Sequence, residues 1–161
     1  MMRSLVCVLS SLIAAASSNA ADWPTYRADA ERSGYVNDRL PAEPSLAWTY
    51  HPFDPPEPAW PRDDRMTFDR APEVVVQEDL LVFGGSVDGR VIGLDATTGA
   101  ERWSFFTGAP VRFAPLVDGD DVYAVSDDGS LYCLAANDGT LKHQWRSAAG
   151  DAMILGNGRM V

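Results

Sequence analysis

A segment of about forty residues occurs twice in succession, and this repeat limits the architectures that the chain can adopt. The first copy contains VIGLDATTGAERWSF at residues 91–105, and LYCLAANDGTLKHQW at residues 131–145 repeats its outline forty positions later. Sequence periods of roughly 20 to 50 residues are typical of solenoids and propellers, in which each repeat is one supersecondary unit. The chain is therefore expected to be an array of similar units.

Each copy contains four segments of strand length and no sustained helical periodicity, which favours β-strands separated by tight turns. In the first copy they are VVV, LLVFGG, RVIGLD and RWSFFT, at residues 74–76, 80–85, 90–95 and 102–107. In the second copy they are APLVDG, DVYAVS, SLYCLA and HQWRS, at residues 114–119, 121–126, 130–135 and 143–147. The sequence thus predicts an all-β fold.

Glycine-containing turns separate these strands at matching positions. Asp-Gly between apolar runs is a strong hairpin signal, because glycine tolerates the positive φ that such turns require. The predicted turn residues are Asp88, Gly89 and Gly99 in the first copy and Asp128, Gly129 and Gly139 in the second. The forty-residue spacing also makes Phe83 equivalent to Tyr123 and Leu94 to Leu134.

The size of the repeat matches a β-propeller blade, which has four antiparallel strands in roughly forty residues. Trp103 begins the outermost strand of the first copy, four residues after Gly99. A tryptophan there can lie flat over the neighbouring blade, where it would bury on the order of 200 Å² and require an acceptor for its indole N–H. We expect Trp103 to dock one blade on the next, which is a structural role.

The repeat divides the chain into five parts. We expect a signal peptide at residues 1–20, a lead-in and proline-rich loop at residues 21–70, blades at residues 71–110 and 111–150, and the start of a further blade at residues 151–161. A propeller closes a ring of about 4 to 8 blades, so about two blades make an incomplete ring. We favour an N-terminal fragment of a longer propeller; the alternative is a short protein that completes its ring by oligomerising.

The N-terminus has the pattern of a secretory signal peptide. A positive start is followed by an apolar run, Leu5 to Ala16, and by Ser18-Asn19-Ala20, whose small residues suit cleavage after Ala20. The run is too short to span a bilayer, which disfavours the alternative of a membrane anchor. The mature protein is expected in the periplasm, the cell envelope or outside the cell, with no membrane span. Its one cysteine, Cys133, lies in an apolar strand, which favours a core residue over a reactive thiol.

The first copy resembles the repeat of a known family. The stretch VFGGSVDGRVIGLDATTGAERW, residues 82–103, is similar to the blades of pyrroloquinoline-quinone-like (PQQ-like) β-propeller proteins, and the resemblance extends over residues 71–146. The lead-in DWPTYRADAERSGY, residues 22–35, resembles the start of secreted bacterial members, including those related to the outer-membrane β-barrel assembly lipoprotein. The family contains quinoprotein dehydrogenases and also scaffolds without a quinone.

The second copy departs from the first near its outermost strand. Ala135 replaces the aspartate found at Asp95, and His143 takes the position of Trp103. Trp145 follows two residues later, and residues two apart lie on the same face of a strand. We therefore expect Trp145 to dock the second blade in a shifted register.

The sequence predicts no catalytic residue and no metal site. Aspartates suit calcium, but the candidates fall where turns require aspartate and lack metal-loop spacing; they are Asp118, Asp120, Asp121, Asp127 and Asp128. His51 and His143 are the only histidines and have neither triad nor zinc spacing, so a hydrolase has no support. Trp60 is expected to pin the proline-rich loop to the body of the protein; docking of a partner is the alternative.

Two functions from different classes remain. The formal net charge of −10 argues against a nucleic-acid partner. The favoured function is a non-catalytic binding scaffold with no cofactor, whose partners are proteins or missing blades of the same chain. The alternative, implied by the resemblance, is the N-terminal part of a quinoprotein dehydrogenase that oxidises alcohols or sugars with PQQ and calcium. Such enzymes also hold a catalytic carboxylate and often a disulfide of adjacent cysteines, and no residues of this chain match that set.

Overall fold

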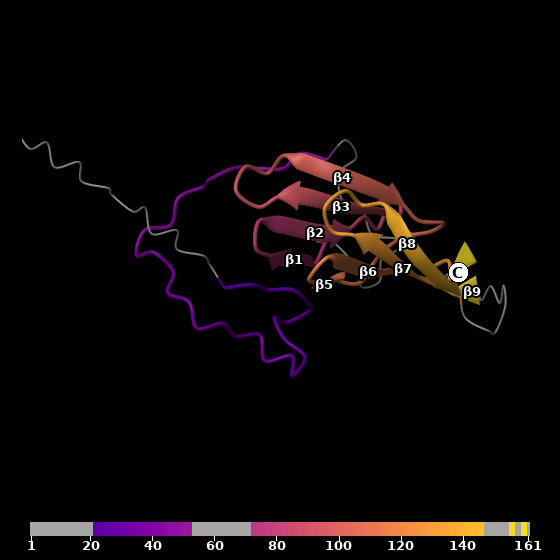
Figure 1. Ribbon diagram of the computed structural model, residues 1–161, viewed down its shortest axis with the longest axis horizontal. Coiled ribbons are helices and arrows are strands. Elements are labelled where there is room, and N and C mark those ends of the chain that lie inside the picture. Colours follow the sequence, from indigo (N-terminus) through magenta and orange to yellow (C-terminus); the bar gives the residue numbers. More distant parts are fainter. Residues whose placement is uncertain (1–20, 53–71, 147–154, 157–158, 161) are drawn as a thin grey trace, which may run out of the picture.

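The computed structural model describes residues 21–52, 72–146, 155–156 and 159–160. The predicted signal peptide and most of the proline-rich loop, including Trp60, lie outside the described residues. The described part contains strands and turns, arranged as two four-stranded sheets followed by a two-stranded hairpin (Figure 1). This confirms the all-β fold class that the repeat predicts.

The first sheet is the first predicted blade. Its strands follow the order of the sequence, with every neighbouring pair antiparallel: β1 (Val74–Gln77), β2 (Leu80–Gly84), β3 (Arg90–Asp95) and β4 (Glu101–Phe106). Each strand begins or ends within two residues of its predicted boundary. The short connections allow this up-and-down order, because antiparallel neighbours need only a hairpin turn between them.

The second sheet repeats the first in the same order: β5 (Leu116–Asp118), β6 (Asp121–Val125), β7 (Ser130–Ala135) and β8 (Leu141–Arg146). A third hairpin then pairs β9 (Leu155–Gly156) with β10 (Arg159–Met160). The connections from β1 to β2, from β5 to β6 and from β9 to β10 are each two residues long, since Gln77 pairs with Leu80, Asp118 with Asp121 and Gly156 with Arg159.

The apolar core lies between the two sheets. Alternate residues of a strand point to opposite faces, and one face of each sheet is turned towards the other. The buried residues of this core come from both blades and the connection between them: Val75, Leu80, Val82, Val91 and Trp103 from the first sheet, Val111 from the connection, and Val117, Val122, Ala124, Tyr132 and Leu134 from the second sheet. The ring of Phe105 also lies 5.6 Å from that of Tyr132, measured between centroids.

The predicted equivalence of Phe83 and Tyr123 is wrong by one residue. Phe83 pairs with Ile92, whose equivalent forty residues later is Tyr132, and Tyr132 pairs with Ala124. The turn between β2 and β3 is one residue longer than the turn between β6 and β7, which shifts β2 against β6. Because a shift of one residue moves a side chain to the other face of the sheet, Ala124 takes the place of Phe83.

The lead-in segment crosses the first strands of both sheets. The backbone of Trp23 pairs with that of Val76 in β1 through two hydrogen bonds of 2.7 and 2.8 Å. The carbonyl of the next residue, Pro24, accepts a hydrogen bond of 2.8 Å from the amide of Val117 in β5. The segment thus ties the two blades together along their first strands. No helix in the described part is long and apolar enough to cross a membrane.

Candidate functional site

A β-bulge places Trp103 over the middle of its own sheet. Gly93 pairs with Trp103 but Leu94 pairs with Glu101, so Arg102 is an extra residue in β4. A Cβ atom on Gly93 would lie 2.4 Å from the indole, which therefore rests directly on the glycine backbone. The second sheet has the same bulge, where Cys133 pairs with His143, Leu134 pairs with Leu141 and Lys142 is the extra residue.

The indole of Trp103 bridges the two blades. Its Nε1 donates a hydrogen bond of 2.8 Å to the carbonyl oxygen of Ala136, in the turn between β7 and β8. The ring also covers Gly139 in that turn, where a Cβ atom would lie 2.6 Å from it. Only 7% of the residue is exposed. The structure thus places Trp103 between the blades, with its N–H satisfied and its ring packed on glycine at both faces.

Trp48 makes the same contacts with the first blade, and sequence reasoning missed it. Its Nε1 donates a hydrogen bond of 3.0 Å to the carbonyl of Ala96, and its ring covers Gly99. Ala96 and Gly99 lie forty residues before the partners of Trp103. The available signal was Trp48-Thr49-Tyr50, which has the same kinds of residue as Trp103-Ser104-Phe105.

Trp145 lies on the open face of the second sheet. It pairs with Leu131, so it occupies the position of Phe105 rather than that of Trp103, and it is 48% exposed. Its ring lies tilted against that of His143, at 5.5 Å between centroids. No blade covers this face within the described ranges, so docking by Trp145 stays a prediction.

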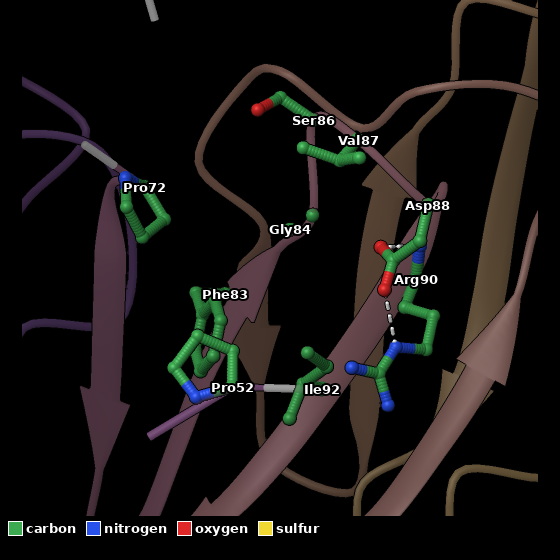
Figure 2. A pocket seen from close by; sticks show the side chains of 10 residues that line it. Pro52, Pro72, Phe83, Gly84, Ser86, Val87, Asp88, Arg90 and Ile92 are labelled. Atoms are coloured by element: carbon green, nitrogen blue, oxygen red, sulfur yellow. Dashed lines mark hydrogen bonds and ion pairs between the residues drawn. The ribbon is translucent and has the colours of Figure 1, made fainter. Parts of the chain in front are cut away.

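The turn residues of the first blade form hydrogen bonds within that blade. Gly89 has a φ of 67°, and its carbonyl accepts hydrogen bonds from the amide and the hydroxyl of Thr107. The carboxylate of Asp88 accepts hydrogen bonds from the Arg90 amide at 3.1 Å and from Arg90 Nε at 2.6 Å (Figure 2). Gly99 also has a positive φ, of 73°, and closes the turn before β4.

The equivalent turn of the second blade reaches across to the first. Asp128 accepts hydrogen bonds from the amide of Ser130 at 2.8 Å, from the hydroxyl of Tyr132 and from the amide of Gly108, which lies in the connection between the blades. Burial raises the pKa of Asp128, but hydrogen bonds from Tyr132, Ser130 and Gly108 outweigh burial and leave its pKa below the usual range. Gly129 gives the turn its positive φ of 79°.

The extra residue of each β-bulge, Arg102 or Lys142, is a cation that binds polar groups of the preceding turns and strands of its own sheet. Arg102 Nη2 lies 2.6 Å from a carboxylate oxygen of Asp79, in the turn between β1 and β2, and 2.6 Å from Asp95. Lys142 does the same in the second blade, where Nζ binds the carbonyl of Asp120 at 2.9 Å and the carboxylate of Asp121. These pairs are partly exposed, so each adds modestly to stability.

We expect Asp95→Asn to weaken the dependence of stability on acidic pH. Hydrogen bonds from Arg102 and then from the amide and hydroxyl of Thr98 lower the pKa of Asp95 to about 2. A lowered folded-state pKa adds stability that is complete above the unfolded pKa and is lost as the pH falls through the folded one. Urea midpoints measured between about pH 4 and pH 2 should therefore fall more steeply for the wild type than for D95N. The exposed Asp118 provides the control D118N, which should follow the wild type. If the urea midpoints of wild type and D95N fall equally steeply with pH, the lowered pKa of Asp95 is contradicted.

In the described ranges, no group of three or more His, Cys, Asp or Glu side chains has the arrangement of a metal site. Cys133 is 2% exposed, and burial raises the pKa of its thiol. His51 and His143 are both exposed. Arg112 and Asp127 form a bidentate ion pair at 2.7 to 2.9 Å where the connection between the blades meets the second sheet.

Two solved structures are similar to parts of this chain. BamB from Moraxella catarrhalis is 31% identical, with 46% of this chain and 23% of that chain covered and a TM-score of 0.42. The quinohemoprotein alcohol dehydrogenase from Comamonas testosteroni is 20% identical, with 84% of this chain and 21% of that chain covered and a TM-score of 0.59. The chain thus spans about a fifth to a quarter of the length of these structures. No curated protein matches the sequence.

A family model extends this likeness over most of the chain. Residues 42–161 match the family described as outer membrane protein assembly factor BamB. This range contains both four-stranded sheets and the third hairpin, and it begins shortly before Trp48. The chain therefore belongs to this family of PQQ-like repeat β-propellers.

Proposed function

We propose that this protein is an exported, non-catalytic binding scaffold that assembles with other proteins of the cell envelope. Membership of a family described as an assembly factor for outer membrane proteins supports a protein partner. The signal-peptide pattern of residues 1–20 supports export. A propeller suits this role, because its rigid blades present loops and edges on a fixed frame.

The observation that carries the proposal is that charged side chains of the blades pair with one another. Arg90 pairs with Asp88, Arg102 with Asp79 and Asp95, Arg112 with Asp127, and Lys142 with Asp121. The carboxylates of Asp88 and Asp128 bind the amides of their own turns. These groups hold the blades in shape, and the recurring tryptophan holds the blades together.

The alternative is the N-terminal part of a quinoprotein dehydrogenase, and the fold shared with the Comamonas testosteroni enzyme supports considering it. PQQ is an anionic quinone with carboxylate groups, so a protein site needs cations directed at it. Four cations in or between the two sheets are already paired with nearby carboxylates: Arg90, Arg102, Arg112 and Lys142. These four cations are held by carboxylates rather than directed at a ligand, which favours the scaffold.

Two experiments test the proposal on the protein expressed from its natural gene. In the first, purified protein is incubated with PQQ and calcium and assayed for dye reduction with alcohols and sugars. We expect no rate above a protein-free control, and substrate-dependent dye reduction would favour the dehydrogenase. In the second, proteins are cross-linked in intact cells and identified by mass spectrometry. We expect adducts with envelope proteins; a cytoplasmic location without adducts would contradict the scaffold.

A further inference from the structure

The first residues of the lead-in are each bonded to a fixed partner. The amide of Ala21 donates a hydrogen bond to the carboxylate of Asp38, farther along the lead-in. The carboxylate of the next residue, Asp22, accepts a hydrogen bond of 2.8 Å from the amide of Glu78, in the turn between β1 and β2. The two residues that follow bind the backbones of β1 and β5. Ala21, which directly follows the expected cleavage site, is therefore part of this bonded stretch.

The first blade fixes the register of the stretch. Trp23 forms both backbone hydrogen bonds with Val76, and the carboxylate of Asp22 binds the amide of Glu78. A shift of the lead-in by one residue would break all three bonds and turn the side chain of Trp23 to the opposite side. The position of Ala21 is thus set by its neighbours, without any contribution from its own hydrogen bond.

Asp38 can receive a cation at this position. Its side chain is exposed, and no lysine or arginine in the part of the chain that the structure describes forms an ion pair with it. An ionised carboxylate only accepts hydrogen bonds, and the amide of Ala21 supplies one of them. The neighbouring carboxylate of Asp22 is bonded to Glu78 instead. Asp38 is therefore the carboxylate that binds the nitrogen of Ala21.

Cleavage after Ala20 changes the chemistry of this nitrogen. Hydrolysis breaks the amide bond between Ala20 and Ala21, and water supplies a hydroxyl group to the carbonyl carbon and a hydrogen to the nitrogen. An α-amino group has an ordinary pKa of about 8, so at neutral pH the new amine takes up a proton and carries three N–H donors. Hydrogen bonds between ionised partners are roughly twice as strong as those between neutral groups. A neutral amide that binds Asp38 thus becomes a cation that forms an ion pair with it.

We propose that Asp38 receives the α-ammonium group of the mature N-terminus, so that removal of the signal peptide fastens the lead-in across the first strands of both blades. The proposal rests on export, which is part of the proposed function. Because Trp23 binds β1 and Pro24 binds β5, the ion pair at Ala21 strengthens a contact that joins the two blades.

Hydrogen exchange measures how firmly the lead-in is docked. The amide of Val76 donates to the carbonyl of Trp23, and the amide of Val117 donates to the carbonyl of Pro24. Both amides therefore exchange when the lead-in opens. The protein is exported by a host cell from its natural gene, and its intact mass should show that the mature chain begins at Ala21.

A matched pair of substitutions tests the ion pair in this mature protein. Asp38→Asn keeps the shape of the side chain and removes its charge, and it should speed exchange of the Val76 and Val117 amides by about two- to fivefold, as for an exposed ion pair. Glu43→Gln is the control, because it removes an exposed carboxylate from the same lead-in and should leave both rates unchanged. The amides of β3 should keep their rates in both variants, which separates opening of the lead-in from unfolding of the blade.

A displaced N-terminus tests whether Asp38 acts through the amino group. Insertion of Gly-Ser between Ala20 and Ala21 moves the new amine two residues away from Asp38, and D38N should then change the two rates by less than about 1.5-fold. Equal acceleration by D38N in both backgrounds would overturn the proposal, as would wild-type rates for D38N in the mature protein. An exported chain that begins at another residue would overturn the proposal and leave export standing. Uncleaved protein in the cytoplasm would contradict export as well.

Discussion

Replacing Trp103 with alanine is expected to lower the free energy of unfolding by about 3 to 5 kcal/mol, the usual range for truncating a buried aromatic side chain. The indole is 7% exposed and lies between two blades, so its removal leaves a cavity that neither sheet can close alone. The carbonyl of Ala136 also loses its 2.8 Å hydrogen bond from the indole. A partly buried acceptor that loses its partner adds to the cost of the cavity.

Urea denaturation followed by circular dichroism measures this loss, and two controls separate its causes. Trp103→Phe keeps most of the apolar ring and removes the N–H, so its loss should be smaller than that of W103A. Trp145→Ala removes the same side chain from a position that is 48% exposed among the described residues, and its loss should be below about 1 kcal/mol if that face stays open. A loss below about 1 kcal/mol for W103A would mean that Trp103 does not hold the blades together.

The blades themselves could be predicted because their signals are local. Alternating apolar residues and glycine turns specify each hairpin, and the forty-residue spacing repeats them, so strands and turns fell close to their predicted positions. The equivalence of Phe83 and Tyr123 failed because one extra turn residue shifts β2 and changes the face on which a side chain lies. A spacing counted between turns does not reveal such a shift inside a blade.

The docking contacts were less accessible to sequence reasoning. Trp103 was predicted because it follows a turn within a repeat, but Trp48 lies outside the repeats, in a segment dominated by turn residues. Its role depends on the turn at Ala96 and Gly99, about fifty residues away in the sequence. Only the structure shows that both tryptophans lie on equivalent turns.

Gly139→Ala is the second substitution with a large expected effect, a loss of about 3 kcal/mol or more in the free energy of unfolding. Gly139 has a φ of +70°, where an L-residue costs roughly 1 to 2 kcal/mol. Its added Cβ atom would also lie 2.6 Å from the ring of Trp103, which is held between the blades and cannot move away. Gly129 offers a matched control, because it has a φ of +79° but no atom within 4 Å of the added Cβ. Gly129→Ala should therefore show the backbone cost alone.

A double-mutant cycle tests whether the excess cost at Gly139 comes from the tryptophan. In a W103A background the ring is absent, so G139A should cost no more than G129A does in the wild type. The coupling between the two sites should be about 1 to 3 kcal/mol, as for residues in direct contact. If G139A and G129A cost the same in the wild type, the indole does not rest on this turn. The hydrogen bond to Ala136 would then still join Trp103 to the turn between β7 and β8. Since Trp48 covers Gly99 in the same way, Gly99→Ala should couple to W48A by a similar amount, which would place both tryptophans in one recurring blade contact.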